Sequence, residues 1–293
     1  MDATLFDPTH DLDEIRTWQK TLPGPSSLID IEEVIQLEAV QKRTRLWRQA
    51  GQLVALAYVD NFNNLFFEIT PEKTSKEVED AVVDWGVACQ KLLNEHQQSM
   101  ANLDACVRAD APLHLRVLQE HGFETSAIRS LKYRRILNTL ITPMPLPAGY
   151  TLRPVHGEAE VDALVRLHRA AFGTDAMTAE ERLSIMRAPN YLPELDLVAA
   201  DANGTLAAFC IASLEELEGE RVGYTDPIGT HPGFQKQGLA KALLSHALLH
   251  LQQMGATSVY TGTSSENLSM QQLAKGLGFE LYRENIWLTK RLD

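Results

Sequence analysis

The sequence predicts an α/β protein of the α+β type, built from two copies of one folding unit. Strand-like and helix-like segments follow one another through both halves of the chain. Short similar segments recur at a domain-sized interval, and a proline-rich stretch lies between the halves. A length of 293 residues also suits two domains better than one.

The recurring segments lie roughly 150 residues apart. They pair Phe6-Asp7-Pro8-Thr9-His10 with Leu152-Arg153-Pro154-Val155-His156, Ala50-Gly51-Gln52-Leu53 with Asn203-Gly204-Thr205-Leu206, and His121-Gly122-Phe123 with Leu277-Gly278-Phe279. The proline-rich stretch between the copies favours a semi-rigid extended connector. We therefore place one domain at residues 1–140, a linker at 141–149 and a second domain at 150–293.

Periodicity predicts the elements of the second half in order. Residues 150–154 form a strand, 160–172 a helix, 195–201 and 206–213 strands around a turn, and 222–230 another strand. A helix over 239–254, a strand over 258–263, a helix over 267–277 and the last strands within 280–290 follow. The helix over 239–254 should bury one apolar face, formed by Leu239, Leu243, Leu244, Ala247, Leu248 and Leu251.

The segment between strand 222–230 and helix 239–254 is the most informative in the chain. It reads His231-Pro232-Gly233-Phe234-Gln235-Lys236-Gln237-Gly238-Leu239-Ala240. A strand that leads through a glycine-bearing loop into a helix directs main-chain N–H groups outward at the positive helix end. Gly238 and Ala240 are small, so an anion can approach the backbone there. The pattern predicts an anion site.

The spacing Gln235-x-x-Gly238-x-Ala240 resembles the acyl-CoA pyrophosphate loop of the GNAT N-acetyltransferases, and the resemblance extends over residues 149–293. It implies, for each copy, a mixed, mostly antiparallel twisted sheet flanked by helices. It also implies acetyl-CoA, or a similar acyl-CoA, as co-substrate. The implied binding residues are Ile228, Gly229 and Thr230 beside the pantetheine arm, Gln235, Lys236, Gln237, Gly238, Leu239 and Ala240 at the pyrophosphate, and Asn267. Asn267 fits equally well as the N-cap of the last helix.

The first copy has lost this loop. After a strand over residues 64–69, residues 71–80 contain no glycine and are rich in acidic side chains, which would repel a pyrophosphate. We expect no CoA binding there, only a scaffold whose helix packs through Ala81, Val82, Trp85, Ala88 and Leu92. One intact and one degenerate copy resemble the tandem GNAT proteins, such as the mycothiol synthases.

The expected chemistry is direct attack of an amine on the acyl-CoA thioester, which requires a proton acceptor near the loop. Asp226 is the first candidate, with Tyr224 to orient substrate and Glu220 as a second acceptor, although Asp226 could equally be a structural carboxylate. Many GNAT members carry a tyrosine four residues before the Gly-Phe pair as an acid, and Ala274 stands there. Either Tyr260, Tyr282 or water takes that role, or the thiolate departs unaided.

Composition sets the remaining bounds. A net charge of −12 disfavours a nucleic-acid partner and agrees with an amine substrate, besides promoting solubility. No membrane span or signal peptide is indicated, so we expect a cytoplasmic protein. The cysteines, Cys89, Cys106 and Cys210, lack metal-ligand spacing, so we expect no metal, and Cys210 should be buried in a strand. The internal repeat is compatible with a monomer or homodimer.

The sequence thus predicts an acyltransferase that moves an acetyl or similar acyl group from acyl-CoA to the amine of a small molecule. Two alternatives stay open. One is a protein-lysine acetyltransferase, which would need an open groove for a peptide. The other is a non-catalytic acyl-CoA sensor, which would bind acetyl-CoA without transferring the acetyl group.

Overall fold

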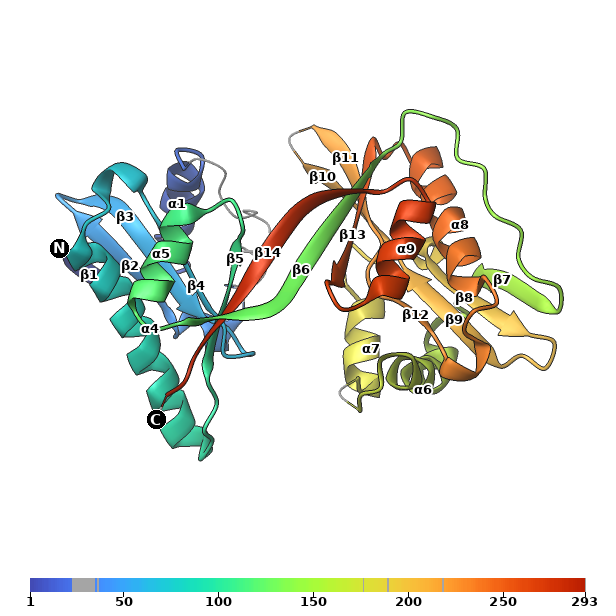
Figure 1. The fold of residues 1–293 in the computed structure, drawn as a ribbon, viewed down its shortest axis with the longest axis horizontal. Coiled ribbons are helices and arrows are strands. Elements are labelled where there is room, and N and C mark those ends of the chain that lie inside the picture. The colour runs from blue at the N-terminus through green and yellow to red at the C-terminus, as the bar shows by residue number, and fades with distance from the viewer. Residues whose placement is uncertain (23–34, 36, 176, 189, 218, 293) are drawn as a thin grey trace. The chain divides into compact units, whose positions relative to one another are not determined.

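The chain divides into two compact units in a computed structural model that describes residues 1–22, 35, 37–175, 177–188, 190–217 and 219–292 (Figure 1). One unit comprises Met1–Arg129 with Asn285–Asp293, and the other Ser130–Glu284. The division falls inside two long strands, β6 (Glu124–Ile136) and β14 (Glu280–Lys290). Each half of the sequence therefore contributes part of its last strand to the other unit. The domain boundaries at residues 140 and 150, which we placed from the sequence repeat, stay a prediction.

The first unit contains an antiparallel sheet in the order β1-β2-β3-β4, and a strand β5 that pairs with Asn285–Lys290 of β14. The strands are β1 (Asp2–Leu5), β2 (Thr44–Gln49), β3 (Gln52–Val59), β4 (Leu65–Ile69) and β5 (Leu103–Arg108). The helices are α1 (Leu12–Gln19), α3 (Glu38–Gln41), the 3-10 turn η1 (Pro71–Lys73), α4 (Lys76–Gln97) and α5 (Pro112–Glu120).

Helix α4 buries only part of the face expected, and Ala81 packs at the edge of the core. Val82 is buried and Trp85 packs at the edge of the core, but Ala88 and Leu92 are exposed. The buried face also contains Gly86, where a β-carbon would stand 2.7 Å from Cδ1 of Leu65. The helix therefore meets the sheet through a position without a side chain, which a search for apolar periodicity overlooks.

The second unit contains two sheets. The first has the order β12-β9-β8-β7 and is antiparallel throughout, and the second has the order β10-β11-β13-β6 with one parallel pair, β11 with β13. The strands are β7 (Tyr150–Pro154), β8 (Asp196–Asp201), β9 (Leu206–Ile211), β10 (Ser213–Leu217), β11 (Glu220–Tyr224), β12 (Ile228–Thr230) and β13 (Ser258–Ser264). The helices are η2 (Gly157–Glu160), α6 (Val161–Phe172), α7 (Ala179–Met186), η3 (Pro193–Leu195), η4 (Pro232–Phe234), α8 (Leu239–Gln253) and α9 (Leu268–Gly276).

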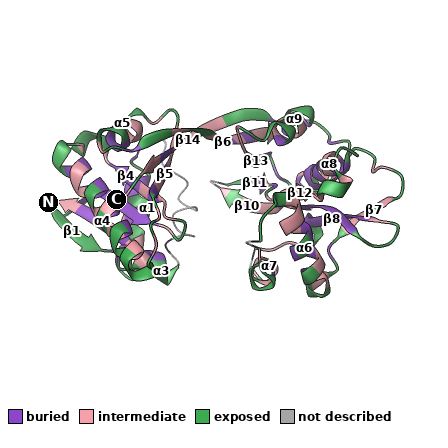
Figure 2. Cartoon of the chain, turned by 60° about the horizontal axis from the view of Figure 1, so that its bottom comes forward, coloured by how far each residue is buried: buried purple, intermediate pink, exposed green. Residues whose placement is uncertain are grey.

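Helices cover both faces of the β8 and β9 strands, which are mostly buried (Figures 1 and 2). Helix α8 packs on one face, and each of its six predicted core residues has an exposed fraction of 1% or less. Cys210 lies in the same cluster and is fully buried, as expected. Helix α6 packs on the opposite face through Leu164 and Leu167, against Val198 and Phe209. In the described ranges, no helix combines the length and apolarity needed to cross a membrane.

The strand expected over residues 222–230 is interrupted, and this corrects the prediction. β11 ends at Tyr224 and pairs with β13, whereas β12 begins at Ile228 and pairs with β9. Asp226 lies in the break, next to Pro227, whose nitrogen carries no hydrogen for a sheet ladder. Asp226 is therefore not an unusual carboxylate inside a strand, but the residue at which the chain changes its strand partner.

The proline-rich linker runs alongside helix α8 and is hydrogen-bonded to it. The Ile141 amide donates to Oε1 of Gln252 over 3.0 Å, and the Met144 amide donates to Oγ of Ser245 over 2.8 Å. Gln252 also donates to the carbonyl of Thr139 over 2.7 Å. The linker is thus an ordered strap on the helix that follows the glycine loop.

Candidate active site

The loop between β12 and α8 leaves a helix N-terminus open. Lys236 and Gly238 both have left-handed φ angles, of 62° and 89°, so the backbone turns sharply twice before the helix begins. The first intrahelical bond is from the Ala242 amide to the Gly238 carbonyl, and no described side chain caps this helix end. The amides of Leu239 and Ala240 therefore lack helical acceptors, as an anion site requires.

Neighbouring side chains hold the loop in place. Gln235 returns to the Thr230 carbonyl through Nε2 at 3.3 Å, and the Tyr150 hydroxyl donates to Gln237 over 2.8 Å. His231 accepts a hydrogen bond from the Gly233 amide through Nδ1 at 3.1 Å, so its ring supports the loop. A β-carbon on Gly238 would have no neighbour closer than 4.0 Å, which leaves the space over the loop open.

Strand β12 is the edge of its sheet. The Pro227 carbonyl accepts from Ile211 and the His231 amide donates to Ala207, so these residues direct their main-chain groups toward β9. Main-chain groups alternate in direction along a strand, so those of Ile228 and Thr230 face away from β9. They provide an open main-chain edge beside the loop.

Gly229 has a different part in this strand. By the same alternation its main-chain groups face β9, where it pairs with Phe209. A β-carbon on Gly229 would stand 2.7 Å from Cε1 of Phe209 and 2.9 Å from the β-carbon of Ala171 on α6. The missing side chain lets α6 approach the strand closely.

Two rows of side chains cross the second sheet next to the break. Tyr224, Tyr260 and Arg134 are in register across β11, β13 and β6. Two residues further along, Asp226 lies against Gly262, which is paired with Lys132 on β6. A β-carbon on Gly262 would stand 3.1 Å from Oδ2 of Asp226. The glycine thus leaves room for this carboxylate between β11 and β6.

Two tyrosine rings and a lysine lie in the rows that contain that carboxylate. The rings of Tyr224 and Tyr260 stack with centroids 5.8 Å apart, and Nζ of Lys132 lies 5.6 Å and 5.5 Å from their centroids. The Asp226 side chain is solvent-exposed, yet the surrounding protein desolvates its charged form and raises its pKa, while the charge of Lys132 opposes that effect. An accessible carboxylate with a raised pKa is suited to accept a proton.

The structure also places the other residues that the sequence analysis singled out. Tyr282 packs edge-on against Tyr260 at 5.3 Å, so the two tyrosines left open as acids are adjacent. Ala274, which stands where the resemblance expects a tyrosine, has an exposed fraction of 0% in the core, so this position faces inward. Asn267 accepts from the Met270 amide over 3.0 Å and is the N-cap of α9, as one of the two expectations had it.

Tyr224 lies two residues before Asp226, whereas Glu220 lies far from both. Glu220 begins β11 and lies roughly 13 Å along the strand from Tyr224, at the rise of an extended chain. Its role as a second acceptor stays a prediction. The sequence analysis missed Lys132 and Arg134, which come from the first half of the chain. The sequence pattern that could have identified them is the alternation of apolar and basic residues in β6. Leu131 and Tyr133 are buried in the core, so Lys132 and Arg134 face the opposite side of the sheet.

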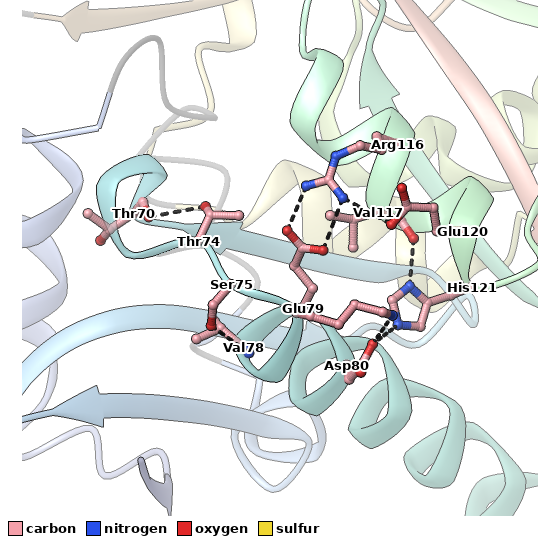
Figure 3. Close-up of polar contacts among 11 residues, drawn as sticks. Thr70, Thr74, Ser75, Val78, Glu79, Asp80, Arg116, Val117, Glu120 and His121 are labelled. Carbon is pink, nitrogen blue, oxygen red and sulfur yellow. Dashed lines mark hydrogen bonds and ion pairs between the residues drawn. The ribbon is translucent and has the colours of Figure 1, made fainter.

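The matching helix start in the first copy is closed by its own side chains (Figure 3). Ser75 caps α4 by accepting from the Val78 amide, at 3.4 Å. Glu79, in the first turns, is 3% exposed and pairs with Arg116 at 2.6 Å. Asp80 lies between Lys76 and His121. Among the described residues of the chain, no cluster of three His, Cys, Asp or Glu side chains could hold a metal ion.

Comparison with known proteins gives these features a context. Residues 161–279 match the acetyltransferase (GNAT) family. The chain is 27% identical over 168 residues to a mycothiol acetyltransferase of Propionibacterium freudenreichii subsp. shermanii, which covers 53% of this chain and 54% of the relative. The chain is aligned over about half the length of the first curated relatives it matches.

Two solved structures match almost the whole chain. A GCN5-related N-acetyltransferase from Sphaerobacter thermophilus has a TM-score of 0.82 at 18% identity, over 99% of this chain and 95% of that chain. A tandem GNAT protein from the clavulanic acid biosynthesis pathway has a TM-score of 0.76 at 17% identity, over 100% and 98%. The predicted α+β fold, with two tandem GNAT-like domains, is confirmed.

Proposed function

We propose that this chain, an acyl-CoA-dependent N-acetyltransferase of the GNAT family, transfers an acetyl group to the amine of a small molecule by direct attack in a ternary complex. The observation that carries this proposal is the change of strand partner at Asp226. It puts a carboxylate with a raised pKa just before an open strand edge and an uncapped helix N-terminus.

Acetyl-CoA would bind as an extra strand-like partner. Its pantetheine amides would pair with the free main-chain groups of Ile228 and Thr230, because these face away from β9. The pyrophosphate would accept hydrogen bonds from the loop and helix amides, from Gln235 to Ala240. Gly229 would contribute by its lack of a side chain, which lets α6 pack close to β12. The exposed Asn267 side-chain amide would contact the pantetheine.

The reaction is then a simple exchange of bonds. The acceptor arrives as an ammonium and gives a proton to Asp226, directly or through water. The free amine forms a bond to the thioester carbonyl carbon, and main-chain N–H groups stabilise the negative charge on the carbonyl oxygen. The carbon–sulfur bond breaks and the CoA thiolate leaves, and the second amine proton passes from the product nitrogen to this thiolate, directly or through water. Tyr224 would orient the amine beside Asp226.

The mycothiol acetyltransferase names of the relatives agree with a small-molecule acceptor, and the proposal extends that class to this chain. The first copy would bind no CoA, because Ser75 already caps its helix and the Glu79 and Asp80 carboxylates occupy the first turns. One bound acetyl-CoA per chain is therefore expected.

Calorimetric titration with acetyl-CoA tests the site. We expect Gly238→Glu to abolish binding, because a carboxylate would stand where the pyrophosphate lies. Gly204→Glu is the matched control: its φ of 84° is also left-handed and its β-carbon would also meet no close neighbour. Both variants carry the same strain and charge, so strong binding by Gly238→Glu would refute the assignment. Binding without release of CoA thiol on addition of any amine would instead indicate a sensor.

A further inference from the structure

Two cations stand on the sheet face that carries Asp226. Lys132 and Arg134 alternate along β6 with Leu131 and Tyr133, which are buried in the core, so both cations face the opposite side. Both are half-buried. Lys132 lies over Tyr224 and Tyr260, and the Arg134 guanidinium lies 4.6 Å from the centroid of Tyr282.

Neither cation forms an ion pair within the described part of the chain, although the charge of Lys132 acts on Asp226 from a distance. No hydrogen bond or ion pair is made there by the side chain of Lys132 or Arg134, and their contacts are with tyrosine rings. In a protein with a net charge of −12, carboxylates are abundant elsewhere. Two half-buried cations that form no ion pair, one of them facing the proposed proton acceptor across Gly262, indicate a place for an external anion.

The spacing between neighbouring strands sets how far apart the backbones of Asp226 and Lys132 lie. Asp226 and Lys132 lie on either side of Gly262, and neighbouring strands are about 4.8 Å apart, so about 10 Å of sheet separates their backbones. Because Gly262 has no side chain, its position in β13 puts no side chain between the carboxylate and the ammonium. A small molecule with one charge at each end would span this gap.

We propose that the acceptor is a zwitterion, an amine that also carries a carboxylate or phosphate, and that Lys132 with Arg134 binds its anionic group while Asp226 binds the amine. This inference rests on the proposed acetyl transfer and adds the substrate class. It also assigns a specificity-determining role to a strand from the first half of the chain.

The test is a comparison of matched amines with acetyl-CoA, followed by release of the CoA thiol. One arm compares amino acids with their carboxamides, and the other compares glucosamine 6-phosphate with glucosamine. We expect the anionic member to have a kcat/KM about tenfold to a hundredfold higher, as suits a charge-assisted contact. The arm that shows this preference identifies carboxylate or phosphate as the recognised group.

Lys132→Met should reduce that preference ratio toward one, and Lys132→Arg should keep most of it. The ratio is the decisive quantity, since Asp226 acts on both members of a pair and any effect of Lys132 on Asp226 cancels. Arg134→Met provides a second variant should Lys132→Met fold poorly. Equal rates for both members with the wild-type protein, or an unchanged ratio in both methionine variants, would overturn the inference alone. Absence of transfer to every amine would overturn the proposed function as well.

Discussion

A single added methyl group at Gly229 tests how closely strand β12 and helix α6 pack. In Gly229→Ala the new β-carbon would lie 2.7 Å from Cε1 and 3.2 Å from Cζ of Phe209, and 2.9 Å from the β-carbon of Ala171. Carbon atoms in contact prefer about 3.5–4.0 Å. The methyl group therefore overlaps both a ring and a helix, and either α6 or β12 must move.

Overpacking of this kind costs about 1–3 kcal/mol. Since 1 kcal/mol lowers Tm by about 2–4 °C in a domain of this size, we expect Tm to fall by roughly 2 to 12 °C. A shift of β12 would also move the main-chain groups of Ile228 and Thr230, so acetyl-CoA should bind more weakly to the variant.

Thermal unfolding followed by circular dichroism measures the effect, with Gly276→Ala as control. Gly276 ends α9, and a β-carbon there would meet nothing within 4 Å. Alanine is favoured over glycine in helices by about 0.5–1 kcal/mol, so the control should melt at or slightly above the wild-type temperature. If Gly229→Ala melted as high as the control, the close approach of α6 to β12 would be wrong.

Two further predictions concern charged groups of the second unit. Desolvation by the surrounding protein raises the pKa of Asp226, so on acidification the carboxylate is protonated early and kcat/KM should fall as the pH drops through that pKa. Asp226→Asn should lower kcat by about 10²- to 10⁴-fold and remove this acid limb, and an unchanged limb in the pH–rate profile would assign the base elsewhere. Asp196→Asn should destabilise the protein by about 3–5 kcal/mol, because it leaves the buried Arg182 guanidinium without its carboxylate. A loss below about 1 kcal/mol in denaturant unfolding, typical of an exposed pair, would contradict that expectation.

Local patterns were sufficient for the elements around the loop. The apolar spacing of α8 identified its core residues, from Leu239 to Leu251, because a helix that packs on a sheet must bury one continuous stripe. Gly238 was singled out because it is small, and the structure gives it a left-handed φ, which glycine adopts without strain. These features depend on residues within a few positions of each other.

The same reasoning failed where a neighbour decided the outcome. On α4 the buried face includes Gly86, because Leu65 fills the space of its missing side chain. The strand expected over 222–230 is interrupted at Asp226-Pro227, and its two ends pair with different strands. Sequence periodicity indicates that a strand exists and not which strand lies beside it.

The amino-acid sequence by itself therefore determined the family resemblance, the intact second loop and Asp226 as the candidate base. Only the tertiary structure decided what surrounds that base. Register between β13 and β6 brings Lys132 opposite Gly262 and Arg134 opposite Tyr260, across more than a hundred residues of chain. The physical reason is that strand pairing uses main-chain hydrogen bonds, which are alike in every residue, so partners are selected by the packing of the whole unit.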